Sequence, residues 1–405
     1  MPSLANLPPE LFELVLGYAE EPHAREYLGG ICRALHPAAR RFFFRRVRLA
    51  SRDVGCSVVK FCRLLDTSPG LSALVRLLEV DLEYAKERKF LQLAVETLLR
   101  RLPSLTDLCI ASSIANVVLR HPPKKSLLPE LQRLTIEGSF RNRMHPFEPS
   151  DYADLGALPH LEALHIAYWT SYDLIRSSPS ILTLPWASQI TSLSVGAIDH
   201  EGCSPCELLR SFNSLQRLEL AEAKMIGGDL AAALRALPAP LALEHLVLVI
   251  RREVPPALGT ALCRFTNLLS LSFPNPGVSH FPLTSIAMLP HLRTLAFGKP
   301  LYDNALPPFT TFEALLASAS SCPSLQHLDI YRVEPHVPIF PPGTVVDLCS
   351  GADDALEAGA FAREELARKD FLVALAERRG VVLGGDFGAW ARRRREEKRE
   401  EDREK

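Results

Sequence analysis

The chain has 405 residues, 47% of them hydrophobic, and a formal net charge of -1 at pH 7. A single core rarely grows beyond about 250–300 residues, so this length predicts several domains or a repeating architecture. The near-neutral charge argues against a nucleic-acid partner, and neither a membrane-spanning run nor a signal peptide is recognisable, so we expect a protein of the cytoplasm and/or the nucleus.

The first predicted element is a helix within "LPPELFELVLGYAEEP", Leu7 to Pro22. Two prolines suit the first turn of a helix, where the missing N–H would be unpaired in any case. Apolar residues then fall on two faces of the helix, an arc wider than one core needs. Two further helical pieces are expected over residues 25–35 and 37–49.

These three segments resemble an F-box, with the match in "LPPELFELVL", "LGGICRAL" and "FFFRRVRL". The resemblance implies a three-helix module over residues 4–49 that docks on the Skp-type adaptor of SCF ubiquitin ligases, and through it on a cullin. The tryptophan often found near the end of the second or third helix is absent. An ordinary helical cap on the following repeats remains the alternative. The adaptor-binding residues that the resemblance implies are Leu7, Pro8, Leu11, Phe12, Leu14, Val15 and Leu16.

A six-residue pattern, apolar-x-x-Leu-x-apolar, recurs ten times between residues 75 and 330, with first positions 24 to 33 residues apart. Its last four positions alternate with period two, which predicts a strand with one buried face. The copies read "VRLLEV", "LTDLCI", "LQRLTI", "LEALHI", "ITSLSV", "LQRLEL", "LEHLVL", "LLSLSF", "LRTLAF" and "LQHLDI".

Helical stretches are predicted between some copies, at 90–101, 228–237 and 311–321. Strand, helix and strand at a steady interval are typical of a solenoid, in which stacked units share one core. The stretch resembles the leucine-rich repeats, which implies an α/β fold with a parallel sheet on the concave face and helices or loops on the convex face. The asparagine that this family often carries after the strand is missing, so we expect an irregular solenoid. A doubly wound α/β domain is the rival interpretation, although no Gly-rich phosphate loop follows any strand.

The regular interval weakens after Ile330. A proline-rich loop at 334–343 precedes a predicted amphipathic helix at 361–380, which Gly380 would end. A last strand is predicted at 381–383. We therefore assign 50–383 to the solenoid, with a C-terminal cap at 334–383, and 384–405 to a charged tail that is either helical or disordered.

Catalytic and metal motifs are weak throughout the chain. The segment "HEGCSPC" holds His200, Cys203 and Cys206, but no second ligand pair follows at the spacing of a zinc finger. No nucleophile elbow, phosphate-binding loop or H-E-x-x-H occurs. We therefore expect no metal, no cofactor and no catalytic residue. An enzyme on an α/β sheet remains a minor alternative, and a deep pocket with several titratable groups would favour it.

The third and fifth positions of each motif, and the residue after it, are expected to face away from the core. This face has mixed charge, so a protein substrate fits it better than a nucleic acid or a membrane. The interpretation that follows is a monomeric substrate receptor within an SCF-type ubiquitin ligase. A scaffold unrelated to ubiquitin is the alternative. The candidate substrate-binding residues are Arg133, His165, Trp169, Arg217, Glu219, His245, His327, Asp329 and Tyr331.

Overall fold

All ten copies of the motif form β-strands in the computed structural model, and each strand begins at the third motif residue. Every paired neighbour runs parallel, so the α/β class and the parallel sheet predicted from the sequence are confirmed. The structure describes residues 44–50, 54–81, 88–111, 128–137, 158–166, 169–170, 185–196, 198–199, 209–221, 228–250, 256–274, 283–298, 309–317, 321–330 and 367–404.

The chain divides into two compact units, Met1–Ser194 and Val195–Lys405. The sequence-based boundary at 49/50 falls inside the first unit. Its strands lie in chain order, β1-β2-β3-β4-β5-β7. They are β1 (Arg46–Ala50), β2 (Leu77–Asp81), β3 (Asp107–Ala111), β4 (Arg133–Glu137), β5 (Ala163–Ile166) and β7 (Ser192–Val195), with a short β6 at Trp169–Thr170.

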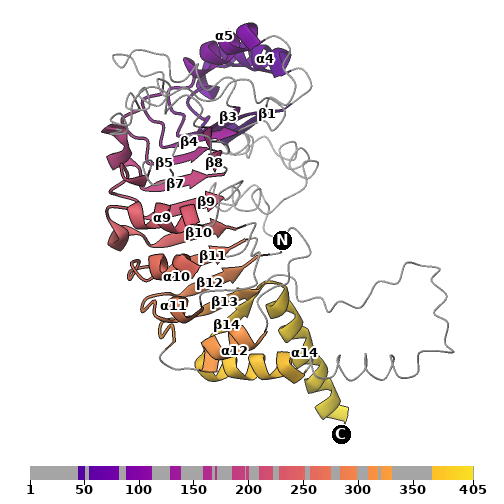
Figure 1. Cartoon of the computed structure of the whole chain (residues 1–405). Helices are drawn as coiled ribbons and strands as arrows, with labels where there is room; N and C mark the ends of the chain where they lie inside the picture. The colour runs from indigo at the N-terminus through magenta and orange to yellow at the C-terminus, as the bar shows by residue number, and fades with distance from the viewer. Residues whose placement is uncertain are drawn as a thin grey trace, which may run out of the picture. The chain divides into compact units, whose positions relative to one another are not determined.

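Strands also follow chain order in the second unit, from β9 to β14 (Figure 1). They are β9 (Arg217–Ala221), β10 (His245–Val249), β11 (Ser270–Phe273), β12 (Thr294–Phe297), β13 (His327–Ile330) and β14 (Val382–Gly384), and a two-residue β8 lies at Ile198–Asp199. The predicted strand at 381–383 is therefore present as β14. One parallel strand per repeat is consistent with a solenoid.

Strand β1 corrects the helix predicted over 37–49. Helix is present at residues 44–45, but Arg46–Ala50 are extended and pair in parallel with β2. Arg46 and Arg48 alternate with Val47 and Leu49, which is the period of a strand rather than of a helix. Pairing with β2 fixes this segment as a strand. The rest of the predicted F-box-like helices lie outside the described residues.

Burial alternates along every motif strand. In β4, Leu134 and Ile136 are each 1% exposed, whereas Arg133 and Glu137 on either side are exposed. The buried positions are leucine, isoleucine, valine or phenylalanine in every copy, and each such side chain stabilises the fold by about 2 kcal/mol. The period-two pattern of the sequence thus reports a real core face.

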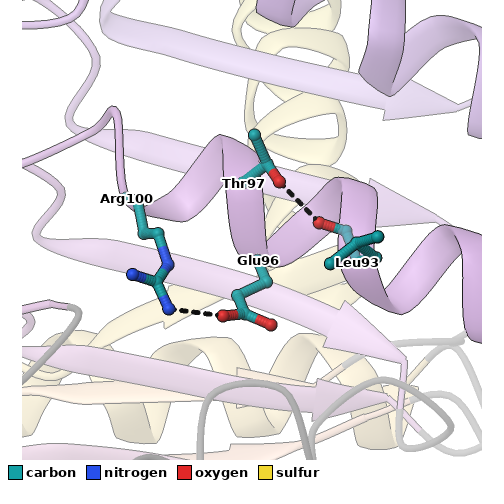
Figure 2. A network of polar contacts seen from close by, with 4 residues as sticks. All are labelled: Leu93, Glu96, Thr97 and Arg100. Carbon is teal, nitrogen blue, oxygen red and sulfur yellow. Dashed lines mark hydrogen bonds and ion pairs between the residues drawn. The ribbon is translucent and has the colours of Figure 1, made fainter.

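Helices accompany the strands in both units. In the first unit, α4 (Val54–Thr67) packs against α5 (Arg88–Leu99), and Arg101 joins them by donating to the Cys62 carbonyl at 2.9 Å and pairing with Asp66 at 2.6 Å. Two side-chain contacts join neighbouring turns on the exposed side of α5 (Figure 2). There Thr97 Oγ1 donates to the Leu93 carbonyl at 2.8 Å, and Arg100 bridges Glu96 one turn away at 2.6 Å.

In the second unit the helices form a series beside the strands (Figure 1). Helix α9 contacts α10, α10 contacts α11 and α11 contacts α12. These helices are α9 (Gly228–Ala236), α10 (Pro256–Leu262), α11 (Leu283–Ala287) and α12 (Phe309–Ala317). Aromatic rings fill the core beneath them, since Phe273 stacks on Phe297 at 5.8 Å and Phe297 meets the ring of Phe312 edge-on at 5.1 Å.

One backbone device recurs where the strands begin. The carbonyl of the second motif residue accepts two amides, from the second and third motif residues of the next copy, at 2.8–3.1 Å. These carbonyls belong to Arg76, Thr106, Gln132 and Glu162 in the first unit, and to Gln216, Glu244, Leu269 and Arg293 in the second. The turns that lead into these strands therefore use backbone groups alone for this contact.

The C-terminal cap begins with a helix whose described part is 367–379. Gly380 has a φ of +68°, its N–H donates to Glu377, and Val381 N–H donates to Ala376. This pair of hydrogen bonds is a Schellman motif, in which a left-handed residue ends the helix. The stop predicted at Gly380 is therefore present.

The charged tail forms helix α14 (Gly385–Glu404). Its first half packs through buried Phe387 and Ala391, and the Phe387 ring lies 5.4 Å from that of Trp390. A Cβ added at Gly385 or at Gly388 would collide with the carbonyl oxygen of Ile330 or Leu383, respectively, so α14 approaches the ends of β13 and β14 at a distance that only glycine permits.

Arg379 ties the cap to the preceding repeat. Its guanidinium donates to the carbonyls of Leu315 and Ser321, each at 2.9 Å, and of Cys322 at 3.2 Å. These carbonyls lie near the end of α12 and in the turn before β13. One side chain thus donates to three backbone carbonyls at a half-buried junction.

We predict that Gly380→Ala lowers the free energy of unfolding by about 1 kcal/mol, because a left-handed conformation strains an L side chain. Nothing lies within 4 Å of the added Cβ, so backbone strain is the whole effect. Urea denaturation checks it. The control is Gly70→Ala, which also meets no atom within 4 Å and has no left-handed φ. Equal midpoints for the two variants would contradict the prediction.

We also predict that Arg379→Ala destabilises the junction by about 1–3 kcal/mol, because a charged donor to three carbonyls is lost. Amide hydrogen exchange in 309–330 should accelerate. The neighbouring Arg378 is exposed and has no partner within the described part of the chain. Arg378→Ala should therefore leave exchange in this segment unchanged, and a similar acceleration in both variants would refute the role of Arg379.

Candidate functional site

The outward face of the strands carries two rows of side chains, which we call the polar face. The first row holds the third motif residue of each strand and the second row holds the fifth. Strand pairing aligns these residues directly, as between Arg217 and His245, or Thr294 and His327. Adjacent strands are about 4.8 Å apart, so neighbouring members of a row are within reach of one ligand.

In the first unit, the charged members of these rows neutralise one another. Arg48 bridges Glu79 at 2.8 Å, and Arg46 lies 3.9 Å from the same carboxylate. Arg133 pairs with Asp107 at 3.1 Å, and the Thr106 hydroxyl donates to that carboxylate at 2.6 Å. Such exposed pairs contribute about 0–1 kcal/mol each to stability. Their main consequence is that little charge is left to attract a ligand.

His165 continues the second row of the first unit. Its Nδ1 lies 2.6 Å from the Ser194 hydroxyl on the neighbouring strand, and either atom can be the donor. A serine–histidine contact alone is not a catalytic arrangement, because the histidine also needs an orienting group and the serine an oxyanion site. Neither is found among the described residues around this pair.

The second unit has a different polar face. Its first row is Arg217, His245, Ser270, Thr294, His327 and Val382, and its second row is Glu219, Val247, Ser272, Ala296, Asp329 and Gly384. Charged residues lie at the two ends of this group, and small residues lie between them. Arg217 and His327 are exposed, and the others named in the sequence-based prediction are half-buried.

The structure places seven of the nine predicted substrate-binding residues on the polar face. Arg217, Glu219 and His245 come together on adjacent strands, and His327 and Asp329 lie together on β13, whereas Arg133 and His165 belong to the first unit. Trp169 lies in the short β6, outside the row of motif strands. Tyr331 lies outside the described residues, as do all the predicted adaptor-binding residues from Leu7 to Leu16.

The sequence prediction missed four charged residues of the face. Glu79 and Asp107 occupy the fifth and third positions of their motifs, so the rule that selected Arg133 would also have selected them. Arg46 and Arg48 lie on β1, at the third and fifth positions of "FRRVRL", which fits the motif except that Val47 replaces the leucine.

An open groove of about 530 Å³ lies where β9 to β12 begin. It is lined by Ser214, Gln216, Leu241, Ala242, Glu244, Asn267, Leu269 and His291. Its two titratable side chains, Glu244 and His291, are both exposed. Asn267 Nδ2 donates to the Leu241 carbonyl at 2.9 Å, so one of its polar groups already serves the turns. The groove lacks the enclosure that a desolvated active site requires.

Within the described residues, no cluster of histidine, cysteine and carboxylate side chains has the arrangement of a metal site. The segment with His200, Cys203 and Cys206 lies outside them. Burial raises the pKa of the Cys322 thiol to about 11, although nearby Arg379 acts in the opposite direction, and its Sγ lies 3.0 Å from the Ile286 carbonyl. A buried thiol of this kind is a poor nucleophile.

Comparisons with known proteins add no family assignment, because neither a protein-family model nor a curated protein sequence matches the chain. Among the described helices, none combines the length and the apolar character needed to span a membrane. Any function therefore has to be argued from the residues and their geometry.

We predict that Cys322 reacts with iodoacetamide at pH 8 at least about 100-fold more slowly than Cys263, since Cys263 is exposed and a pKa of about 11 leaves little thiolate. Peptide mass mapping over time measures both sites in one sample. In denaturant the two rates should converge. Equal labelling of the folded protein would contradict the prediction.

The same shift has a consequence for stability. Because the folded pKa lies above the ordinary value of 9.0, the unfolded chain releases this proton first. The contribution of the protonated Cys322 thiol to the free energy of unfolding is therefore complete below pH 9. It is lost as the pH rises from 9 towards 11.

Proposed function

We propose that this chain is the substrate-recognition subunit of an SCF-type ubiquitin ligase. Residues 4–49 would dock on a Skp-type adaptor and through it on a cullin, and the polar face of the strands would bind a protein substrate. The chain itself would perform no chemistry. The gain in rate would come from holding the substrate near a ubiquitin-loaded enzyme recruited elsewhere in the complex.

The observation that carries the proposal is the direct junction between the two parts of the sequence pattern. Arg46–Leu49, the second half of the last F-box-like segment "FFFRRVRL", belong to β1, which pairs with the first motif strand, so no linker separates this segment from the sheet. An F-box-like opening and a repeating parallel sheet are thus continuous in one chain, which is the order of parts in the F-box and leucine-rich-repeat family.

The polar face also supports a recognition role. It is open, it presents two aligned rows, and in the second unit its charges have no ion-pair partner among the described residues. Protein interfaces use surfaces of this mixed character, with arginine among the residues that anchor them. The open groove beside it lacks an enclosed catalytic constellation, which favours binding over chemistry.

One observation favours the second candidate, a scaffold in which the N-terminal helices only cap the repeats. Arg46–Ala50 are part of the sheet, as the end of a capping segment would be. In that case the apolar helix predicted between Leu7 and Pro22 would need no second protein.

We predict that a Skp-type adaptor co-purifies with the wild-type chain and is lost from the double variant Leu7→Ala/Pro8→Ala, because the resemblance places both residues in the docking segment. Size-exclusion chromatography followed by mass spectrometry measures the complex. The matched control is Leu93→Ala, which truncates a leucine that is 64% exposed on α5 and should leave the complex intact.

Absence of the adaptor from a well-folded wild-type chain would leave the scaffold as the better proposal. Loss of the adaptor from the Leu93→Ala variant as well would show that the effect is not specific to the N-terminal module. Circular dichroism of each variant verifies folding.

A further inference from the structure

The first row of the second unit has an unusual chemical uniformity. Five consecutive strands, β9 to β13, present a side chain that can donate a hydrogen bond at the same register position. The donors are Arg217, His245, Ser270, Thr294 and His327. Arginine, hydroxyl and imidazole groups all donate to carboxylate oxygens, and arginine does so with two N–H groups in parallel.

These donors are not used within the described part of the chain. No side-chain hydrogen bond or ion pair joins any of the five to another described residue. Arg133 occupies the same register position in the first unit, but its guanidinium is held by Asp107 at 3.1 Å. The same type of residue is therefore paired in the first unit, whereas in the second unit it has no partner among the described residues.

The second row explains why a ligand would follow the first row. Between its ends it offers only Val247, Ser272 and Ala296, which are too short to compete for the space above the sheet. Asp329 at the far end lies against Gly384, where a Cβ would collide with its carboxylate, immediately before the start of α14.

We propose that the first row of the second unit binds an extended, acidic peptide segment of a protein partner, which crosses β9 to β13. The inference rests on the proposed function only in treating the polar face as a recognition surface. It adds the chemistry of the partner: carboxylate side chains at alternate positions, with small residues between them.

Dimensions support this occupant. Four strand spacings of about 4.8 Å make the row about 19 Å long. An extended segment directs every second side chain to the same side at intervals of about 6.6 Å, so three or four carboxylates fit along the row. A nucleic acid fits less well, since its continuous phosphates need several cationic contacts, whereas a peptide can place one carboxylate on Arg217 and the others on the hydroxyl and imidazole donors of the row.

The test uses the purified full-length chain and fluorescein-labelled peptides in a fluorescence anisotropy titration. The acidic probe has the sequence Gly-Glu-Ser-Glu-Ser-Glu-Ser-Gly, and two matched probes replace each glutamate by glutamine or by lysine. We expect the acidic probe to bind at least about tenfold more tightly than the glutamine probe, and its affinity to fall as salt screens the charges.

Matched variants locate the site. Arg217→Gln and His245→Gln should each weaken the acidic probe by about fivefold to tenfold, which is the loss of one charge-assisted hydrogen bond. Arg133→Gln and His165→Gln remove the same residue types from the first unit, where Asp107 and Ser194 are their partners. These controls should change the affinity by less than about twofold.

Several results would overturn the inference. They are equal binding of the acidic and glutamine probes, tighter binding of the lysine probe or of single-stranded RNA, or equal effects of Arg217→Gln and Arg133→Gln. Because no adaptor is present in this titration, the outcome is independent of the co-purification experiment. If the acidic peptide does not bind but the adaptor co-purifies, only the proposal of an acidic partner is lost. If the acidic peptide binds but the adaptor does not co-purify, only the proposed role in a ubiquitin ligase is lost.

Discussion

At eight junctions between neighbouring motif strands, the arrangement depends on one backbone constraint: a single carbonyl oxygen accepts two amide hydrogens from the next repeat. It recurs at Thr106 and Gln132 in the first unit and at Gln216 and Glu244 in the second. Both lone pairs of the oxygen are used, so the start of each strand is fixed against its neighbour. Because the constraint lies in the backbone, it holds while the length of the repeat varies from 24 to 33 residues.

Fixed strand starts leave the outward side chains free to vary. The buried positions must be apolar, since they face the core, but the third and fifth motif residues contribute little to folding. The first unit fills them with charges that satisfy one another, such as Arg48 with Glu79. In the second unit, Arg217 and His327 flank small residues and have no described partner. One architecture thereby supports a neutralised surface and a surface suited to recognition.

Parallel repeats must also be closed at their last strand, because an open edge exposes unpaired backbone groups. Here β14 has only Val382–Gly384, and α14 covers its end through the close approach at Gly385 and Gly388. Arg379 joins this cap to the previous turn by three hydrogen bonds. The charged tail is therefore the end of a structural element as well as a solvated surface.

The sequence alone determined which residues form the ten motif strands, because leucine at every second position leaves one period and one buried face. It also determined the helix stop at Gly380, where only glycine adopts the left-handed turn cheaply. Tertiary structure decided that Arg46–Ala50 form a strand, because this short alternation of arginine and apolar residues is stabilised as a strand only by pairing with β2. It also decided which charges are satisfied, because Arg133 and Arg217 share a motif position and differ only in the residue that the neighbouring strand places beside them.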